Sequence, residues 1–152
     1  MPFKKRDHEG KDYVNALLNY GYGILYSEIE RACILAGLDP YLGYLHTDRY
    51  GKPCLVLDFI EEFRQTIVDR SVINLFVHKQ ILDEDFEKQG DSFYLSKKGR
   101  EKLVSAIYEK LNNPFKYRGV KTSLRQVILD QARLVVRYLL EDKIYEPFIY
   151  GR

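Results

Sequence analysis

Cysteine is scarce in this sequence, where Cys33 and Cys54 are the only two among 152 residues. So few thiols exclude a disulfide scaffold, and their spacing does not suggest a zinc site, so we expect reduced, buried thiols in a cytoplasmic protein. No apolar run approaches the length that spans a membrane, and no charged-then-apolar leader opens the chain. We therefore expect a soluble protein without a membrane partner.

Several catalytic motifs are missing as well. The sequence contains no P-loop, no GxSxG nucleophile elbow, no dinucleotide-binding glycine fingerprint and no HExxH. The net charge of +2 excludes a polycationic tail but leaves room for a basic face. Tryptophan is absent, whereas there are 13 tyrosines, whose rings can stack on bases but more commonly cap a core with the hydroxyl in water.

Helical periodicity dominates the rest of the chain, so the predicted fold class is mainly α: a helical domain with one short β-hairpin excursion. Apolar residues recur at intervals of three and four over most of the sequence. A run from Phe86 to Leu95, with Gly90–Asp91 in its middle, is typical of the hairpin. The expected segments are a polar N-terminal stretch (1–10), helices over 11–36, 53–81, 96–112 and 123–140, and a linker over 114–120.

Three glycines carry specific expectations. Gly37 follows the last apolar residue of the first helix and should close it as a left-handed cap. Gly21 and Gly23 lie inside that helix, where glycine is destabilising. They indicate that another backbone segment passes close by, or that the helix is distorted near a site.

The pattern that points to chemistry is a histidine followed by carboxylates. His46 lies in a loop, and Asp58 and Glu61 follow it at the start of an apolar-periodic segment. Residues three apart share a helix face, so these two carboxylates would point the same way. One imidazole and two carboxylates suit Mg²⁺ or Mn²⁺ better than zinc. The alternative is a solvated acidic face that also includes Glu62, although the apolar neighbours of Asp58 favour a carboxylate with a cationic partner.

Basic side chains form a second candidate site. Arg64 and Arg70 follow the acids on the same expected helix, where they could clamp a phosphate or form ion pairs that contribute little. Lys97, Lys98 and Arg100 lie at the start of the next long helix. Taken alone, such a cluster is more often solvated surface than a nucleic-acid contact.

Three blocks of the sequence, in their order, carry a resemblance to a known family. They read NALLNYGY, GLDPYLGYLH and LDFIEEFR. They closely resemble the CRISPR-associated endonuclease/integrase, the nuclease subunit of spacer acquisition, in which these elements occur in order at the same spacings. The end of the chain, SLRQVILDQARLVVRYLLEDKIYEPF, looks like the C-terminal helix and tail of that family. The similarity runs from about Tyr13 onward and covers nearly the whole chain.

The resemblance implies a divalent-metal site in a helical catalytic-type domain, here residues 11–152. The positions that match the family's ligands are His46 and Glu61, with Asp58 beside them, and all three would be both metal ligands and catalytic residues. The implied cofactor is Mg²⁺ or Mn²⁺. Tyr26 falls where the family keeps a tyrosine close to the metal.

The resemblance also implies DNA chemistry. Proteins similar to this one cut or join DNA strands, and in integration a 3′-hydroxyl attacks a phosphodiester of the repeat array while the metal stabilises the developing charge. The expected DNA contacts are Tyr26 and the basic residues named above. The expected partners are branched or spacer-repeat duplex DNA, a small companion protein of the spacer-acquisition complex and a second copy of the chain.

One departure from the family matters for activity. The family's third principal ligand is a glutamate roughly sixty residues before the histidine, whereas forty-five residues precede His46. The family's N-terminal β-rich domain is also without a counterpart, so the sequence is interpreted as the C-terminal portion. Loss of one ligand should weaken metal binding, and we expect weak or no activity of this chain alone. The alternative function is a non-catalytic helical module that binds DNA or a partner.

Overall fold

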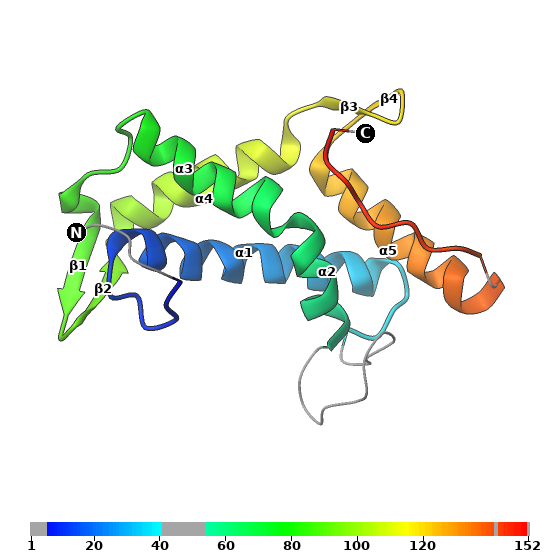
Figure 1. The fold of residues 1–152 in the computed structure, drawn as a ribbon, viewed down its shortest axis with the longest axis horizontal. Helices are drawn as coiled ribbons and strands as arrows, with labels where there is room; N and C mark the ends of the chain where they lie inside the picture. The colour runs from blue at the N-terminus through cyan, green and yellow to red at the C-terminus, as the bar shows by residue number, and fades with distance from the viewer. Residues whose placement is uncertain (1–5, 41–53, 142, 152) are drawn as a thin grey trace.

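The computed structural model describes residues 6–40, 54–141 and 143–151, with only the backbone for 54–58. Helices dominate, and the short β segments are two antiparallel hairpins (Figure 1). The predicted class, mainly α with short β excursions, is confirmed. No helix in the described ranges is long and apolar enough to cross a membrane.

The first helix, α1 (Tyr13–Leu35), runs through the middle of the molecule (Figure 1). The Asp12 side chain caps its start by accepting a hydrogen bond from the Asn15 amide at 2.8 Å. Gly37 follows its end with φ of 84°, so the predicted left-handed cap is confirmed. Its apolar residues contact α2, α4 and α5, which makes α1 the axis of the core.

The second helical stretch is continuous but changes its winding in the middle. It consists of α2 (Cys54–Arg64), the π-helix η1 (Gln65–Asp69) and α3 (Arg70–Val77). The Val68 side chain of η1 lies so close to α1 that a Cβ added to Gly21 would be 2.6 Å from its Cγ1 atom. Gly21 is therefore in close contact with another element, but through side chains and not through the backbone that the sequence predicted, whereas nothing lies within 4 Å of a Cβ added to Gly23.

The first hairpin occupies the predicted place. The short 3₁₀ turn η2 (Asp83–Asp85) leads into β1 (Phe86–Gln89), which pairs with β2 (Ser92–Leu95) across a turn that contains Gly90. The helix α4 (Lys97–Asn112) follows at once, capped by the Ser96 hydroxyl, which accepts a hydrogen bond from the Gly99 amide at 3.1 Å.

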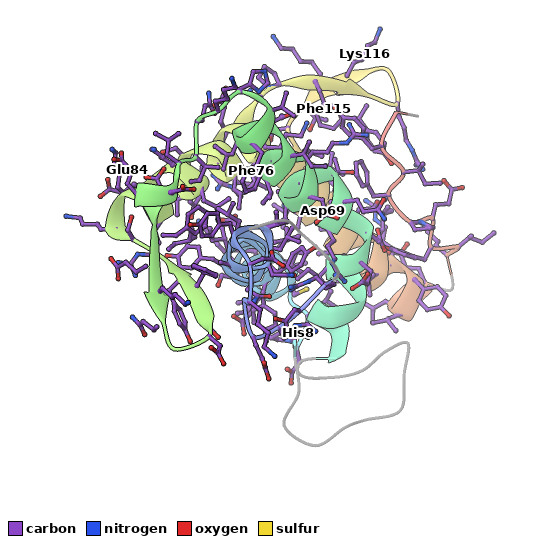
Figure 2. All side chains as sticks on the ribbon, turned by 60° about the vertical axis from the view of Figure 1, so that its left-hand side comes forward. His8, Asp69, Phe76, Glu84, Phe115 and Lys116 are labelled. Carbon is purple, nitrogen blue, oxygen red and sulfur yellow. The ribbon has the colours of Figure 1, made fainter. Side chains whose placement is uncertain are left out.

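A second hairpin lies where the sequence predicted a linker over 114–120, and that part of the prediction is wrong. Strands β3 (Phe115–Tyr117) and β4 (Val120–Thr122) pair across the two residues Arg118 and Gly119. Both turn residues have positive φ, 48° and 82°, which is the geometry of a tight hairpin turn. Strands of three residues are too short to show an alternating pattern, and the turn has an arginine where asparagine is usual. The sequence therefore carries no clear signal of this hairpin. Figure 2 shows Lys116 at the outer edge of this hairpin.

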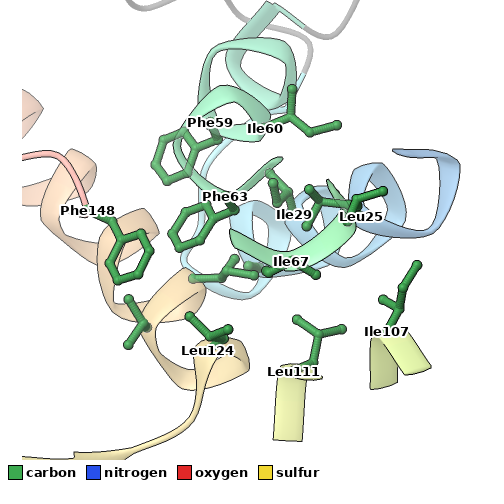
Figure 3. Close-up of a cluster of buried hydrophobic side chains, with 14 of the residues drawn as sticks. Leu25, Ile29, Phe59, Ile60, Phe63, Ile67, Ile107, Leu111, Leu124 and Phe148 are labelled. Carbon is green, nitrogen blue, oxygen red and sulfur yellow. The ribbon is translucent and has the colours of Figure 1, made fainter. Parts of the chain in front are cut away.

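The last helix, α5 (Leu124–Glu141), is followed by an extended C-terminal strap, defined here as residues 143–151. The strap runs back along α5 towards the second hairpin (Figure 1). Its buried Phe148 joins the core beside Phe59 and Phe63 of α2 (Figure 3). Large side chains that are almost inaccessible to solvent join α1, α2, η1, α4 and α5 in one core: Leu17, Leu25, Ile29, Phe59, Phe63, Ile67, Leu103, Ile107, Leu111, Leu124 and Ile128.

Candidate metal and nucleic-acid site

Glu61 is the member of the predicted metal constellation whose side chain the structure describes. It lies on α2, and 64% of its side chain is exposed. His46 lies outside the described residues, as does the side chain of Asp58. Within the described ranges no three histidine, cysteine or acidic side chains gather as a metal site would require. The predicted triad of His46, Asp58 and Glu61 therefore stays a prediction.

The surroundings of Glu61 are basic and aromatic. Its Oε1 atom pairs with Arg64 Nη1 at 2.9 Å, one turn further along α2. The Arg64 guanidinium in turn lies over the ring of Tyr22 on α1, 4.4 Å from its centre. The Tyr22 hydroxyl donates to Asp69 Oδ1 at 2.6 Å, and Arg6 also lies over this ring at 5.0 Å. The guanidinium next to the candidate ligand is thus held by a stacked ring.

Tyr22 keeps its proton in this arrangement. Burial, and then the hydrogen bond to Asp69, raise the pKa of the Tyr22 hydroxyl above its ordinary value. The hydroxyl is therefore a fixed donor to Asp69 and links α1 to the π-helix. Tyr26 lies one turn further along α1, partly buried against the core. Its predicted role at the metal site is not tested by these contacts.

Glu62, the third acid of the segment, has a different role from a solvated or metal-binding carboxylate. Its Oε1 atom accepts a hydrogen bond from the Tyr145 hydroxyl at 2.5 Å. Its Oε2 atom accepts from the Phe148 amide at 2.9 Å and from Gln131 Nε2 at 3.3 Å. Sequence reasoning missed this network, because its partners are separated from Glu62 by 69 to 86 residues. No local pattern signals such contacts.

The oxygen chemistry of Glu61 fits a hard divalent cation. An exposed carboxylate can bind Mg²⁺ or Mn²⁺ without a large desolvation cost, and its one competing partner among the described residues is Arg64. Cys33 does not fit, because it is buried in the core and burial raises the pKa of its thiol to about 11. Glu61 is thus a described side chain whose exposure and oxygen chemistry would suit a divalent cation.

The predicted DNA contacts fall into separate places. Arg70, at the start of α3, stacks over Tyr150 of the C-terminal strap at 4.7 Å, whereas Arg64 stacks over Tyr22 of α1. Lys97, Lys98 and Arg100 are exposed in the first turn of α4, next to the first hairpin (Figure 1).

Part of the charge at the start of α4 is already balanced. Lys98 pairs with the exposed Glu84 at 2.6 Å, and Lys102 pairs with the buried Asp85 at 2.6 Å. The backbone amides at a helix start add positive potential to such a surface. The structure therefore separates a carboxylate site on α2 from a basic surface at the start of α4.

Comparison with known proteins finds a matching family model and similar curated proteins. Residues 1–109 match the family model described as CRISPR associated protein Cas1. The chain is 45% identical over 139 residues to the CRISPR-associated endonuclease Cas1 1 of Archaeoglobus fulgidus, an alignment that covers 91% of this chain and 40% of the relative. The chain thus spans less than half the length of that relative.

Solved structures agree with the sequence match. A casposase bound to integration product superposes with a TM-score of 0.83 at 31% identity, covering 91% of this chain and 41% of the casposase chain. A chain of a partial Cas6-RT-Cas1–Cas2 complex superposes with a TM-score of 0.84 at 25% identity, covering 100% of this chain and 46% of the other.

Proposed function

This chain belongs to the CRISPR-associated Cas1 family of endonucleases and integrases, and we propose that it takes part in divalent-metal-dependent cutting or joining of DNA strands. The observation that carries the proposal is the accessible Glu61 carboxylate on α2, beside an arginine that a tyrosine ring holds in place. Its neighbour Glu62 is fully engaged in hydrogen bonds, so the two acids have distinct roles.

The proposed ligands are His46, Asp58 and Glu61, with Mg²⁺ or Mn²⁺ as the cofactor. When bound, the metal supplies Lewis-acid polarisation of the scissile phosphate and stabilises the charge that develops on it. The protein's own contribution is to hold the Glu61 carboxylate on a packed helix and to place the Arg64 guanidinium next to it. That guanidinium can donate hydrogen bonds to phosphate oxygens, as arginine does at many phosphate sites.

The reaction class is phosphodiester exchange. In integration, a 3′-hydroxyl forms a new phosphorus–oxygen bond while the bond to the displaced strand breaks, and in hydrolysis water takes the place of that hydroxyl. A casposase bound to integration product shares this fold, which supports the proposal. The chain spans 40% of the length of the Archaeoglobus fulgidus relative, and we propose that residues 1–152 by themselves form a weak enzyme, because metal sites lose activity when a ligand that the resemblance implies is not among the residues present.

A metal-binding comparison tests the proposal. Glu61→Gln should weaken Mn²⁺ binding at least about tenfold, measured by the electron paramagnetic resonance signal of free Mn²⁺. Glu84→Gln is the matched control, since Glu84 is an equally exposed glutamate with a basic partner, Lys98. Cleavage of forked DNA in Mn²⁺ should fall in the first variant and not in the second. Equal Mn²⁺ affinity of both variants and the wild type would show that Glu61 is no ligand.

The basic start of α4 supports a second candidate function, a non-catalytic module that binds DNA or a partner. Such a module would bind branched duplex with an affinity that falls as salt rises, and Glu61→Gln would leave that affinity unchanged. DNA binding without any Mn²⁺-dependent nicking would favour the module over the enzyme.

The proposed protein partner is a small companion subunit of the spacer-acquisition complex. A chain of a complex that contains Cas1 and Cas2 shares the fold of the present chain over its full length, which supports this proposal. Co-purification of the two proteins tests it, and two well-separated peaks in size-exclusion chromatography at micromolar concentration would count against it. The same experiment on the chain alone tests the homodimer.

A further inference from the structure

The Glu62 carboxylate joins three segments that are distant in sequence. It accepts hydrogen bonds from Tyr145 and Phe148 of the C-terminal strap and from Gln131 of α5. Gln131, itself buried, also donates to the Glu146 carbonyl at 3.0 Å. The strap is therefore fastened to α2 and α5 at one point, through both oxygens of one carboxylate.

Aromatic packing holds the same two segments together. Phe148 stacks on Phe63 of α2, with ring centres 4.9 Å apart and an angle of 12°. The ring centre of Tyr145 lies 6.3 Å from that of Phe59, which is one turn before Phe63 on that helix. Figure 3 shows Phe148 beside Phe63 and Phe59 in the core. The strap thus covers the side of α2 that carries its phenylalanines.

Glu61 is exposed to solvent, whereas Glu62 contacts the strap. Its neighbour in sequence is turned about 100° around the helix axis, so one residue can face the strap while the next faces solvent. The position of α2 is set by its tertiary contacts and by the continuous helical stretch of which it is the first part. Contacts of α2 with the strap, together with its packing on α1, consequently set the direction in which Glu61 points.

We propose that Glu62 is a positioning residue: by fastening the C-terminal strap to α2, it fixes the helix that presents Glu61 to the metal. The second half of this proposal rests on the proposed function, whereas the first half, the fixing of α2, does not. The carboxylate is needed because it accepts on both oxygens. An amide at the same place offers one acceptor oxygen and turns an NH₂ group towards one of the donors.

The Tyr145 hydroxyl, which donates a hydrogen bond to Glu62, keeps its proton. Burial, followed by the contact with Glu62, raises the pKa of the Tyr145 hydroxyl above its ordinary value. The hydroxyl stays protonated over the working pH range and keeps donating. Tyr145→Phe removes this donor and leaves the ring packing in place, which makes it the companion of Glu62→Gln.

The test compares wild type, Glu62→Gln and Tyr145→Phe, with Tyr138→Phe on the exposed side of α5 as the control. Two quantities are measured at a temperature where all four proteins are folded: amide hydrogen exchange in residues 59–64 and Mn²⁺ affinity. We expect exchange in α2 to be about tenfold faster in both test variants, with exchange in α4 unchanged. We expect Mn²⁺ affinity to fall several-fold, and the control to match wild type.

Each result decides one part of the proposal. Unchanged exchange in α2 would overturn the fastening role of Glu62, whatever the metal does. Faster exchange in α2 with unchanged Mn²⁺ affinity would make the strap purely structural and overturn the positioning role. Absence of Mn²⁺ binding in wild type would overturn the proposed function, and the exchange data would then decide the fixing of α2 alone.

Discussion

Arg64 Nη1 lies 2.9 Å from Glu61 Oε1, so the described carboxylate of the candidate metal site already has a cationic partner. The pair is one helical turn apart, and Arg64 is only partly exposed because it stacks on Tyr22. A metal ion at Glu61 must compete with this guanidinium. Under the proposed function, the arginine would lower the metal affinity of Glu61 and would offer a hydrogen-bond donor to phosphate.

Replacing Arg64 should move metal and DNA binding in opposite directions. Arg64→Gln removes the competing charge, and an exposed ion pair of about 0.5–1 kcal/mol corresponds to a roughly two- to fivefold gain in Mn²⁺ affinity. Affinity for forked DNA should fall, because the glutamine amide carries no charge to neutralise a phosphate. Calorimetric titration with Mn²⁺ and fluorescence anisotropy with labelled DNA measure the two effects.

Arg133→Gln is the control for this prediction. Arg133 pairs with Asp130 at 3.2 Å with the same spacing of three residues, but on α5. The Arg133→Gln variant should have the same Mn²⁺ affinity as the wild type. A loss of Mn²⁺ affinity in Arg64→Gln would contradict the competition and indicate that the arginine supports the ligand.

The basic start of α4 should contribute to DNA affinity by neutralising phosphates. Replacing Lys97, Lys98 and Arg100 together with glutamine should weaken binding and reduce the salt slope of log K by up to about three, one unit for each phosphate that is no longer neutralised. Because Lys98 is already paired with Glu84, its share should be the smallest. Anisotropy titrations over a salt series measure the slope.

A charge-matched triple variant elsewhere on the molecule controls for net charge. Arg31, Arg133 and Lys143 are exposed and lie on α1, α5 and the strap. Their replacement by glutamine changes the net charge by the same amount. If both triple variants reduce the salt slope of log K equally, the electrostatic field of the whole protein attracts DNA, and the start of α4 has no special role.

Much of the fold could be predicted from local patterns. The helix start at Ser96, the Gly37 terminus and the Phe86–Leu95 hairpin each depend on neighbours within a few residues, and the structure has them all. The second hairpin was missed because its strands are too short for an alternating pattern. Its stability comes instead from distant aromatic contacts, such as Tyr117 with Phe148 at 5.3 Å.

The candidate site was predicted from ligand chemistry and resemblance, which made Glu61 a ligand and gave Glu62 no role beyond a solvated acidic face. Glu61 and Glu62 are adjacent and chemically identical, yet one is exposed and the other accepts three hydrogen bonds. Their difference arises from the strap, more than eighty residues later in the chain. Likewise, Arg64 and Arg70 look like one cluster in sequence but stack on rings from different segments.

Asp85 should make the stability of the protein sensitive to acid. Its side chain is 0% exposed and pairs with Lys102, and it also accepts from the Leu82 amide at 2.9 Å. Burial acts to raise the pKa of Asp85, but Lys102 and the amide outweigh it and hold the pKa below its ordinary value. A depressed pKa stabilises the fold above about pH 3.9, and this contribution is lost as the pH falls through the folded-state value.

Asp85→Asn should therefore cost about 3 kcal/mol at neutral pH, because Lys102 loses its partner, and should flatten the acid limb of the stability curve. Urea unfolding at a series of pH values measures both effects. Asp83→Asn, in the same turn but exposed, is the control and should change little. If the stability of Asp85→Asn fell as steeply with decreasing pH as that of wild type, other carboxylates would account for the acid sensitivity.

Two glycines of α1 should respond to the same substitution with opposite signs. A Cβ at Gly21 would meet Val68 Cγ1 at 2.6 Å and Ile107 Cδ1 at 3.3 Å, so Gly21→Ala should overpack the contact between α1 and the π-helix and cost about 1–3 kcal/mol. A Cβ at Gly23 meets nothing within 4 Å, so Gly23→Ala should stabilise the helix by about 0.5–1 kcal/mol. Both free energies of unfolding come from urea denaturation. Because the two sites share one helix and one substitution, helix propensity cancels between them, and a stabilised Gly21→Ala variant would mean that η1 can move away from α1.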